Sequence, residues 1–160
     1  MNSLRNITIV SGGQTGADRV ALDFAIEHGI AHGGWCPRGR LAEDGPIDGR
    51  YQLQETPSRR YAERTEWNVR DSDATVVFTI SSVASGGTAL TIELAKRLDK
   101  PLLLLSRDTG ATAIEHARGL LEFLTVNRAR IVNIAGPRAS QESEIVAFVR
   151  DVLEAALAVG

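Results

Sequence analysis

Residues 7–16 read ITIVSGGQTG, a short β-branched apolar run that passes directly into a glycine-rich turn. Residues 74–80 read ATVVFTI, an uncharged run that is followed by a second glycine-rich turn, SGGT at 85–88. Apolar runs of this length are typical of buried strands, and apolar residues recur at helical spacing after each turn. Each stretch is therefore predicted to be a strand that leads through a tight turn into a helix.

The rest of the chain continues this alternation of strands and helices. Thr56 and Pro57 have the residue types of an N-cap and a first helical position. Further strands are expected at residues 31–36, 101–105 and 130–135. Helices are expected from residue 15 or 16 to 28, and over residues 57–71, 87–98, 112–127 and 140–158.

This order of elements predicts the fold class. All strands except 31–36 are almost continuously apolar, which a strand needs when both faces of its sheet are covered. Strands that alternate with helices form parallel sheets. The sequence therefore predicts an α/β protein with a doubly wound, mostly parallel five-stranded sheet and helices on both faces, in one domain over residues 1–160.

The predicted sheet also predicts where a ligand binds. Ligands of open parallel sheets bind beyond the carboxyl ends of the strands, where the strand order reverses. In the common order 2-1-3-4-5 this point lies between the first and third strands, which the two glycine turns follow. Glycines let an anion approach the free N–H groups at a helix N-terminus. The two turns are therefore expected to face each other across one phosphate-binding crevice.

The turns match neither of the well-known phosphate-binding motifs. The first turn has the form GGxxG, and neither turn has the GxGxxG or GxxxxGK[ST] pattern. Tight packing of the helix on the strand is an alternative explanation for the glycines. Thr15 and Asp18 also have nearly the spacing of a capping box, which leaves a structural role open for both.

Several arginines are candidates for anion binding. Arg19 opposes the helix dipole in the first turn, so we expect it beside a bound anion or a carboxylate such as Asp23. Arg38 and Arg40, in the long irregular segment 37–57, either clamp the anion or lie in solvent. Arg138, after the last strand, leaves the same two alternatives. Alternating charges over residues 59–66, which include Arg64, predict a solvated helix face.

Catalytic and metal-binding patterns are sparse. His28, His32 and His116 have no ligand spacing with Cys36, the only cysteine, so we expect no dedicated metal site. Glu93 follows the second glycine turn and is the best candidate for a general acid or base, with a helix-surface glutamate as the alternative.

Composition narrows the function classes. Apolar residues make up 43% of the chain, and the net charge of −2 provides no overall attraction to nucleic acid or to an anionic membrane. The sequence contains no signal-peptide pattern, and no apolar run approaches the ~18 residues of a membrane span. We therefore expect a cytoplasmic protein without nucleic-acid or membrane partners.

Six segments of the sequence resemble the family of putative molybdenum carriers. They are IVSGGQTGADR at 9–19, GWCPRGR at 34–40, EDG at 43–45, RTEWNVRDSDAT at 64–75, GGT at 86–88 and NIAGPR at 133–138. The resemblance extends over about residues 6–155, with the segments in the family's order. The family is similar to the wider SLOG group, which contains LOG-type phosphoribohydrolases and DprA-like proteins.

This resemblance implies a Rossmann-like sheet, a homo-oligomer and a pocket for a phosphorylated pterin or nucleotide. It implies molybdenum cofactor as the cargo, and a molybdoenzyme or a cofactor-synthesis protein as a partner. The ligand contacts that carry over are Ser11, Gly12, Gly13, Thr15, Gly16, Gly86, Gly87 and Thr88, to which we add Arg19 and Arg38.

The second turn differs from that of the LOG-type enzymes. Their PGGxGTxxE pattern places a glutamate for glycosidic cleavage, whereas residues 85–93 read SGGTALTIE, without the proline and the third glycine. The sequence therefore favours a binding or carrier protein. The alternatives are a LOG-like nucleotide N-glycosidase that uses Glu93, and a nucleotide-sensing domain.

Overall fold

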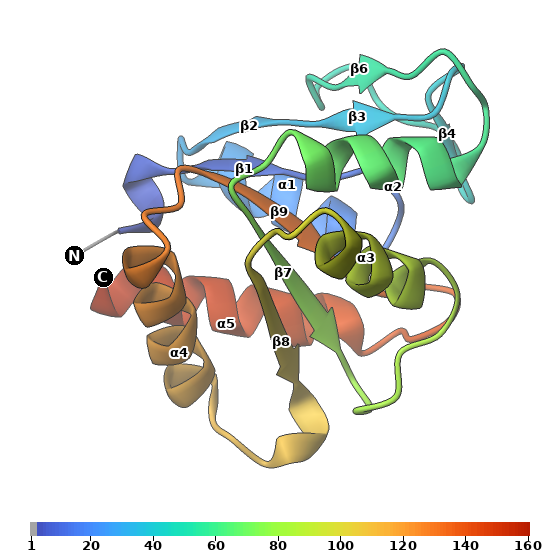
Figure 1. The fold of residues 1–160 in the computed structure, drawn as a ribbon. Coiled ribbons are helices and arrows are strands. Elements are labelled where there is room, and N and C mark those ends of the chain that lie inside the picture. The colour runs from blue at the N-terminus through green and yellow to red at the C-terminus, as the bar shows by residue number, and fades with distance from the viewer. Residues whose placement is uncertain (1–2) are drawn as a thin grey trace.

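A computed structural model of the protein describes residues 3–160. Its centre is a five-stranded sheet in the order β2-β1-β9-β7-β8 (Figure 1). The strands are β1 (Thr8–Val10), β2 (Ala31–Gly33), β7 (Ala74–Thr79), β8 (Leu102–Ser106) and β9 (Ile131–Ala135). All neighbouring strands in this sheet run parallel, which confirms the predicted α/β class.

Helices cover both faces of the sheet, as predicted (Figure 1). Helix α5 (Ile145–Val159) packs against α1 (Ala17–Glu27) and α4 (Ala113–Val126) on one face. On the other face α2 (Tyr61–Arg70) packs against α3 (Gly86–Arg97). The short 3-10 helices are η1 (Leu4–Asn6) and η2 (Arg107–Thr109). None of the helices described in residues 3–160 is long and apolar enough to cross a membrane.

The predicted strand order is wrong. Strand β9, the last in the chain, lies between β1 and β7, so the order of the five predicted strands is 2-1-5-3-4. An apolar run shows that a strand is buried, but it does not show where a crossover returns the chain to the sheet. The change makes β8 an edge strand, and its Leu104 is 52% exposed although burial on both faces was expected.

The predicted strand 31–36 is broken in two. Gly34 has φ of +125°, and a Cβ there would lie 2.3 Å from the carbonyl oxygen of Ser11. The chain therefore leaves the main sheet after β2. Two small ladders follow, β3 (Trp35–Cys36) with β6 (Gln54–Glu55) and β4 (Leu41–Ala42) with β5 (Gly45–Pro46).

Two predicted helix starts are also wrong. Helix α2 begins at Tyr61, and the hydroxyl of Thr56 donates to the carbonyl of Ser58 instead of capping a helix. Helix α5 begins at Ile145, after turns at residues 139–141 and 143–144. The start of α4 was predicted closely, because Thr112 forms a capping box.

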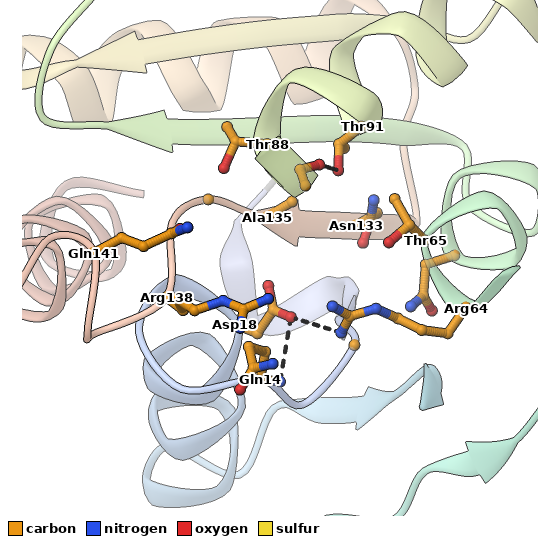
Figure 2. Close-up of a pocket in the computed structure, with 14 residues that line it drawn as sticks. Gln14, Asp18, Arg64, Thr65, Thr88, Thr91, Asn133, Ala135, Arg138 and Gln141 are labelled. Carbon is orange, nitrogen blue, oxygen red and sulfur yellow. Dashed lines mark hydrogen bonds and ion pairs between the residues drawn. The ribbon is translucent and has the colours of Figure 1, made fainter. Parts of the chain in front are cut away.

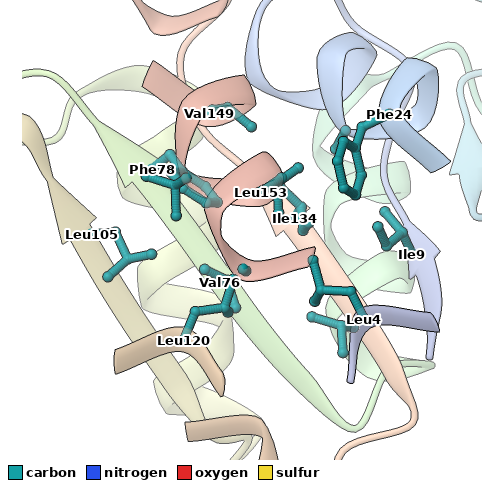
Figure 3. Close-up of a cluster of buried hydrophobic side chains, with 14 of the residues drawn as sticks. Leu4, Ile9, Phe24, Val76, Phe78, Leu105, Leu120, Ile134, Val149 and Leu153 are labelled. Atoms are coloured by element: carbon teal, nitrogen blue, oxygen red, sulfur yellow. The ribbon is translucent and has the colours of Figure 1, made fainter. Parts of the chain in front are cut away.

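The main hydrophobic core lies between the sheet and helices α1, α4 and α5 (Figure 3). Phe78 of β7 and Ile134 of β9 are buried against Val149 and Leu153 of α5, and Phe24 joins them from α1. A smaller cluster, built around Val69 and Leu94, joins α2 to α3. Burial of these side chains holds the strand ends in place, and with them the loops at the carboxyl edge.

Candidate functional site

A polar crevice lies at the carboxyl edge of the sheet, where the loops after β1, β7 and β9 meet. Its inner cavity, about 50 Å³, is shown in Figure 2. An outer cavity of about 150 Å³ shares Thr88 and Gln141 with it. The inner cavity is lined by Gly12, Gln14, Asp18, Arg64, Thr65, Asn68, Gly87, Thr88, Thr91, Asn133, Ala135, Gly136, Arg138 and Gln141. The outer cavity is lined by Thr79, Ile80, Ser81, Val83, Ala84, Ser85, Thr88, Pro137, Gln141 and Glu142.

Both glycine turns reach the inner cavity, although β9 separates their strands. Gly12 contributes from the first turn, and Gly87 and Thr88 contribute from the second. Asn133 lies between them on β9. The two turns do reach one cavity, but the topological reason expected for this required the order 2-1-3-4-5 and does not hold for the observed order.

Glycines of the first turn make room for close packing. A Cβ on Gly12 would lie 1.9 Å from Nη1 of Arg64. Gly16, with φ of +84°, would place a Cβ 2.4 Å from the carbonyl oxygen of Pro137. Contacts this short exclude any side chain unless its neighbours move. Packing, the alternative weighed for these glycines, thus accounts for two of them.

The amino terminus of α1 holds a carboxylate of the chain itself. Asp18 accepts hydrogen bonds from the backbone N–H of Gln14 at 3.3 Å and from Nη1 of Arg64 at 3.2 Å. Burial raises the pKa of the Asp18 carboxyl, while Arg64 and the Gln14 amide act in the opposite direction. The N-cap of α1 is Gly16 without a side-chain bond, so the Thr15–Asp18 capping box does not form.

Arg64 is not on a solvated face, contrary to the prediction. Only 10% of its side chain is exposed, and its guanidinium lies 5.3 Å from the ring centre of Tyr61. An alternating charge pattern indicates solvent exposure only where no other element covers the helix. Here the loop after β1 covers this part of α2, so Arg64 becomes part of the inner cavity.

The amino terminus of α3 is open, in contrast to that of α1. Ser85 is its N-cap but makes no side-chain capping bond, and the first turn contains no acidic residue. A Cβ on Gly87 would meet nothing within 4 Å, and one on Gly86 would meet only Nε2 of Gln141 at 4.0 Å. The first N–H groups of a helix have no intrahelical acceptor. These groups of α3 are therefore accessible to a ligand in the crevice.

Gln14 and Arg138 are two lining residues for which the sequence analysis predicted no role or left alternatives open. Oε1 of Gln14 accepts from the N–H groups of Thr15 at 3.1 Å and Glu43 at 2.9 Å. Its buried Nε2 has no hydrogen-bond partner among the described residues. Arg138 lies 3.8 Å from Glu43, and in Figure 2 its guanidinium points toward that of Arg64 across Asp18. The position of Gln14 among the glycines was the only available signal.

Several predicted ligand residues lie outside the crevice lining. Thr15 donates to Glu43 and accepts from the N–H of Ala139. Ser11 is fully buried, and its hydroxyl donates to the carbonyl of Asp18. Neither hydroxyl is therefore directed at a ligand in this arrangement. Gly13 packs against side chains of the 37–57 segment.

The other predicted arginines also make contacts elsewhere. Arg19 forms an ion pair with Asp44 at 2.9 Å. A carboxylate partner was expected for Arg19, but it is Asp44 and not Asp23. Arg38 is exposed and does not line either cavity. Arg40 donates to backbone carbonyls of its own loop, among them that of Tyr51 at 2.8 Å, so it stabilises segment 37–57.

Glu93 and the histidines take no part in the crevice. Glu93 is 61% exposed and pairs with Arg97 at 2.6 Å on the surface of α3. Among the described residues, one group has ligand atoms close enough for a metal ion: Glu27, His28 and Glu154, within 4.8 Å of one another. Arg150 already lies 2.8 Å from Glu27 and supplies a positive charge to this group.

Comparisons with known proteins agree with this architecture. The crystal structure of a Syntrophus aciditrophicus SB protein, named Putative molybdenum carrier protein, is similar at a TM-score of 0.93 and 44% sequence identity, over 98% of each chain. No curated protein matches the chain. The model of the Circularly permutated YpsA SLOG family matches residues 9–157. On this match, and on the order of elements described above, the chain belongs to the circularly permutated YpsA SLOG family.

Proposed function

We propose that this protein is a cytoplasmic carrier that binds a phosphorylated pterin or nucleotide in the crevice, with the phosphate at the amino terminus of α3. The open first turn of α3 is the observation that carries the proposal. Molybdenum cofactor is the first cargo to test, because the similar Syntrophus aciditrophicus protein is named for molybdenum.

The two helix N-termini at the crevice differ in a way that selects the phosphate position. At α1 the carboxylate of Asp18 already accepts from the N–H of Gln14 and from Arg64. At α3 neither a cap nor an acidic side chain competes with a ligand. Unpaired N–H groups and the helix dipole favour an anion at such an end. In this proposal Gly86, Gly87 and Thr88 contact the phosphate, and the first turn forms the opposite wall.

The outer cavity suits the ring of such a ligand. Ile80, Val83 and Pro137 give it apolar surface beside the hydroxyl groups of Ser85 and Thr88. Val83 is 79% exposed, so a flat ring has an uncovered apolar side chain to pack on. Ile80 and Val83 lie in the loop that leads directly into α3, so a ring bound there would be close to a phosphate at the amino terminus of α3.

No observation favours the hydrolase alternative. The carboxylates that line the two cavities are Asp18, which is paired with Arg64, and Glu142 at the outer cavity. Glu93, the proposed catalytic group of that alternative, is on the exposed side of α3. The binding function therefore has the better support.

The proposal is tested by calorimetric titration of the purified protein with molybdenum cofactor, pterin phosphates and nucleoside monophosphates. We expect tight binding of at least one of them by the wild type. Gly87→Glu places a carboxylate in the open first turn of α3, where space allows it. We expect it to weaken binding tenfold or more, which corresponds to about 1.4 kcal/mol or more.

Gly119→Glu is the matched control. Gly119 also lies in a helix with nothing within 4 Å of its added Cβ, and the charge change is the same, but α4 is away from the crevice. We expect this variant to bind as the wild type does. Folded wild-type protein that binds none of the compounds, or unchanged binding by Gly87→Glu, would refute the proposal.

The proposal also includes the transfer of the cargo between this protein and a partner protein. A carrier passes its cargo to a molybdoenzyme or receives it from a cofactor-synthesis protein. A pull-down with loaded and empty protein checks this, and we expect a partner to be retained in only one of the two states.

A further inference from the structure

The inner cavity contains a hydrogen-bond donor that the fold leaves unused. Gln14 is 4% exposed, its Oε1 accepts two backbone N–H groups, and its Nε2 has no partner among the described residues. A buried amide donor without an acceptor costs about 1–3 kcal/mol. Gln14 lines the inner cavity, and a buried donor beside a cavity is satisfied by an ordered water or by an acceptor of a bound ligand.

Two arginines add donors and positive charge to the same cavity. Arg64 donates from Nε to the carbonyl of Tyr61 at 3.3 Å and from Nη1 to Asp18 at 3.2 Å. A guanidinium carries five N–H donors, so several remain for a ligand. Arg138 lies 3.8 Å from the carboxylate of Glu43. The lining itself contains two arginines and one carboxylate, Asp18, and Glu43 outside the lining offsets part of the charge of Arg138.

The size of the inner cavity limits what fits. A water molecule needs about 10–15 Å³ of cavity volume on this measure, so about 50 Å³ holds roughly four oxygen-sized atoms. The cavity is open to solvent, so a larger group such as a pterin or purine ring would extend out of this space. A tetrahedral group with four oxygens is of the right size, and oxygen acceptors match the donors of Gln14, Arg64 and Arg138.

We propose that the inner cavity is a second anion subsite, which holds a tetrahedral oxyanion through Gln14, Arg64 and Arg138. The inference deepens the proposed function and rests on it for the role of the crevice as a ligand site. The oxyanion is either a second anionic group of the cargo or a free inorganic ion held beside it. Asp18 keeps Arg64 paired while the subsite is empty.

The decisive variant is Gln14→Glu, which keeps the Oε1 acceptor and replaces the unused donor with a negatively charged oxygen. Arg138→Gln is the second variant, because Arg138 is 32% exposed and its removal leaves the core intact. Gln54→Glu makes the same charge change on exposed β6 and serves as the control. The probes are inorganic phosphate, sulfate and molybdate, titrated by calorimetry.

We expect the wild type and Gln54→Glu to bind at least one of these ions equally well. Gln14→Glu and Arg138→Gln should each weaken that binding tenfold or more. Wild-type protein that binds no oxyanion would overturn the inference, and so would equal binding by the folded Gln14→Glu and Arg138→Gln variants.

A second titration distinguishes the two sources of the oxyanion. If the subsite holds a group of the cargo, free oxyanion should compete with a nucleoside diphosphate for binding. In that case Gln14→Glu should weaken the binding of the diphosphate more than the binding of the monophosphate. If it holds a separate ion, saturating oxyanion should leave nucleotide binding unchanged.

The same variants separate this inference from the proposed function. In one outcome, Gly87→Glu loses nucleotide or pterin binding and Gln14→Glu has no effect on the binding of any probe. That result would support the proposed function and refute the second subsite. In the other outcome, Gln14→Glu loses oxyanion binding and Gly87→Glu does not change the binding of phosphorylated ligands. That result would support the subsite and refute the proposal that the phosphate binds at the amino terminus of α3.

Discussion

Gly12 shows how a residue of a glycine turn serves the site without being a phosphate contact. The absence of its Cβ lets Arg64 lie against the turn and reach Asp18, 46 residues away in the sequence. A buried charge needs such a partner, because leaving it unpaired is costly. The glycine, the arginine and the aspartate therefore form one structural unit at the wall of the inner cavity.

We predict that Gly12→Ala destabilises the protein. The new Cβ would lie 1.9 Å from Nη1 and 2.8 Å from Cδ of Arg64, so the whole guanidinium end must move. Overpacking of this kind costs about 1–3 kcal/mol. Urea denaturation should show this loss. Gly119→Ala is the control, because its added Cβ meets nothing, and it should be neutral or slightly stabilising.

His116 provides a second prediction at the residue scale. It is 7% exposed, its Nε2 has no hydrogen-bond partner among the described residues, and its ring packs on Phe148 at 5.3 Å. Burial lowers the pKa of His116 below its ordinary value, and Glu115 opposes this only in part. The unfolded chain then binds a proton at a higher pH than the native protein does.

The stability that depends on neutral His116 is fully present above the unfolded pKa, about 6.5. It decreases as the pH falls from there through the folded pKa. His116→Phe keeps the aromatic contact and removes the titration, so its melting temperature should decrease less between pH 7.5 and pH 5 than that of the wild type. Parallel melting curves for the two proteins over this range would contradict the prediction.

At the scale of elements, the carboxylate of Glu43 links the segment 37–57 to two loops at the site. Glu43 accepts from Thr15 and from both the N–H and the hydroxyl of Ser140. It thereby joins β4 and β5 to the turn before α1 and to the loop after β9. Hydrogen bonds from Ser140 and Thr15 lower the pKa of Glu43 below its ordinary value.

We predict that Glu43→Gln loosens this connection and reduces stability at pH 7 by about 1 kcal/mol. Because the folded pKa of Glu43 is depressed, its contribution is present above the unfolded pKa and is lost as the pH falls through the folded value. The difference between variant and wild type should therefore shrink in acid. Glu122→Gln, at an exposed position of α4, is the control, and a loss equal to that of Glu43→Gln would refute the role of Glu43.

Elements also show which local signals are reliable. The expected start of α4 at residue 112 agrees with the structure, where Thr112 forms a capping box with Glu115, three residues away. Thr56 and Pro57 had suitable residue types for a helix start, yet α2 begins at Tyr61, because Thr56 is held by its contact with Ser58. Residue type alone does not decide between a cap and a turn.

At the scale of the whole molecule, the position of β9 decides the site. It brings the loop with Arg138 between the two glycine turns, where the expected strand order would have left them as direct neighbours. The crevice therefore has three walls instead of two. The added wall supplies Asn133, Gly136 and Arg138 to the inner cavity.

Self-association remains a prediction from the family resemblance. Native mass spectrometry of freshly isolated protein should show a multiple of the 17.2 kDa chain. The same spectrum should show the added mass of a retained phosphorylated ligand. A mass equal to one chain at micromolar concentration would contradict the predicted homo-oligomer, and a multiple without added mass would show that the cargo is lost during isolation.

The sequence by itself determined the alternation of strands and helices, the parallel α/β class and the two turns that reach the crevice. Each of these follows from periodicity, apolar runs or glycine within about ten residues, which are local properties of the chain. Only the tertiary structure decided the strand order, the burial of Arg64 against Gly12 and Asp18, and the unused donor of Gln14. These features depend on contacts between residues far apart in the sequence, and the local pattern of a charged helix or a glycine turn is the same whether or not another element covers it.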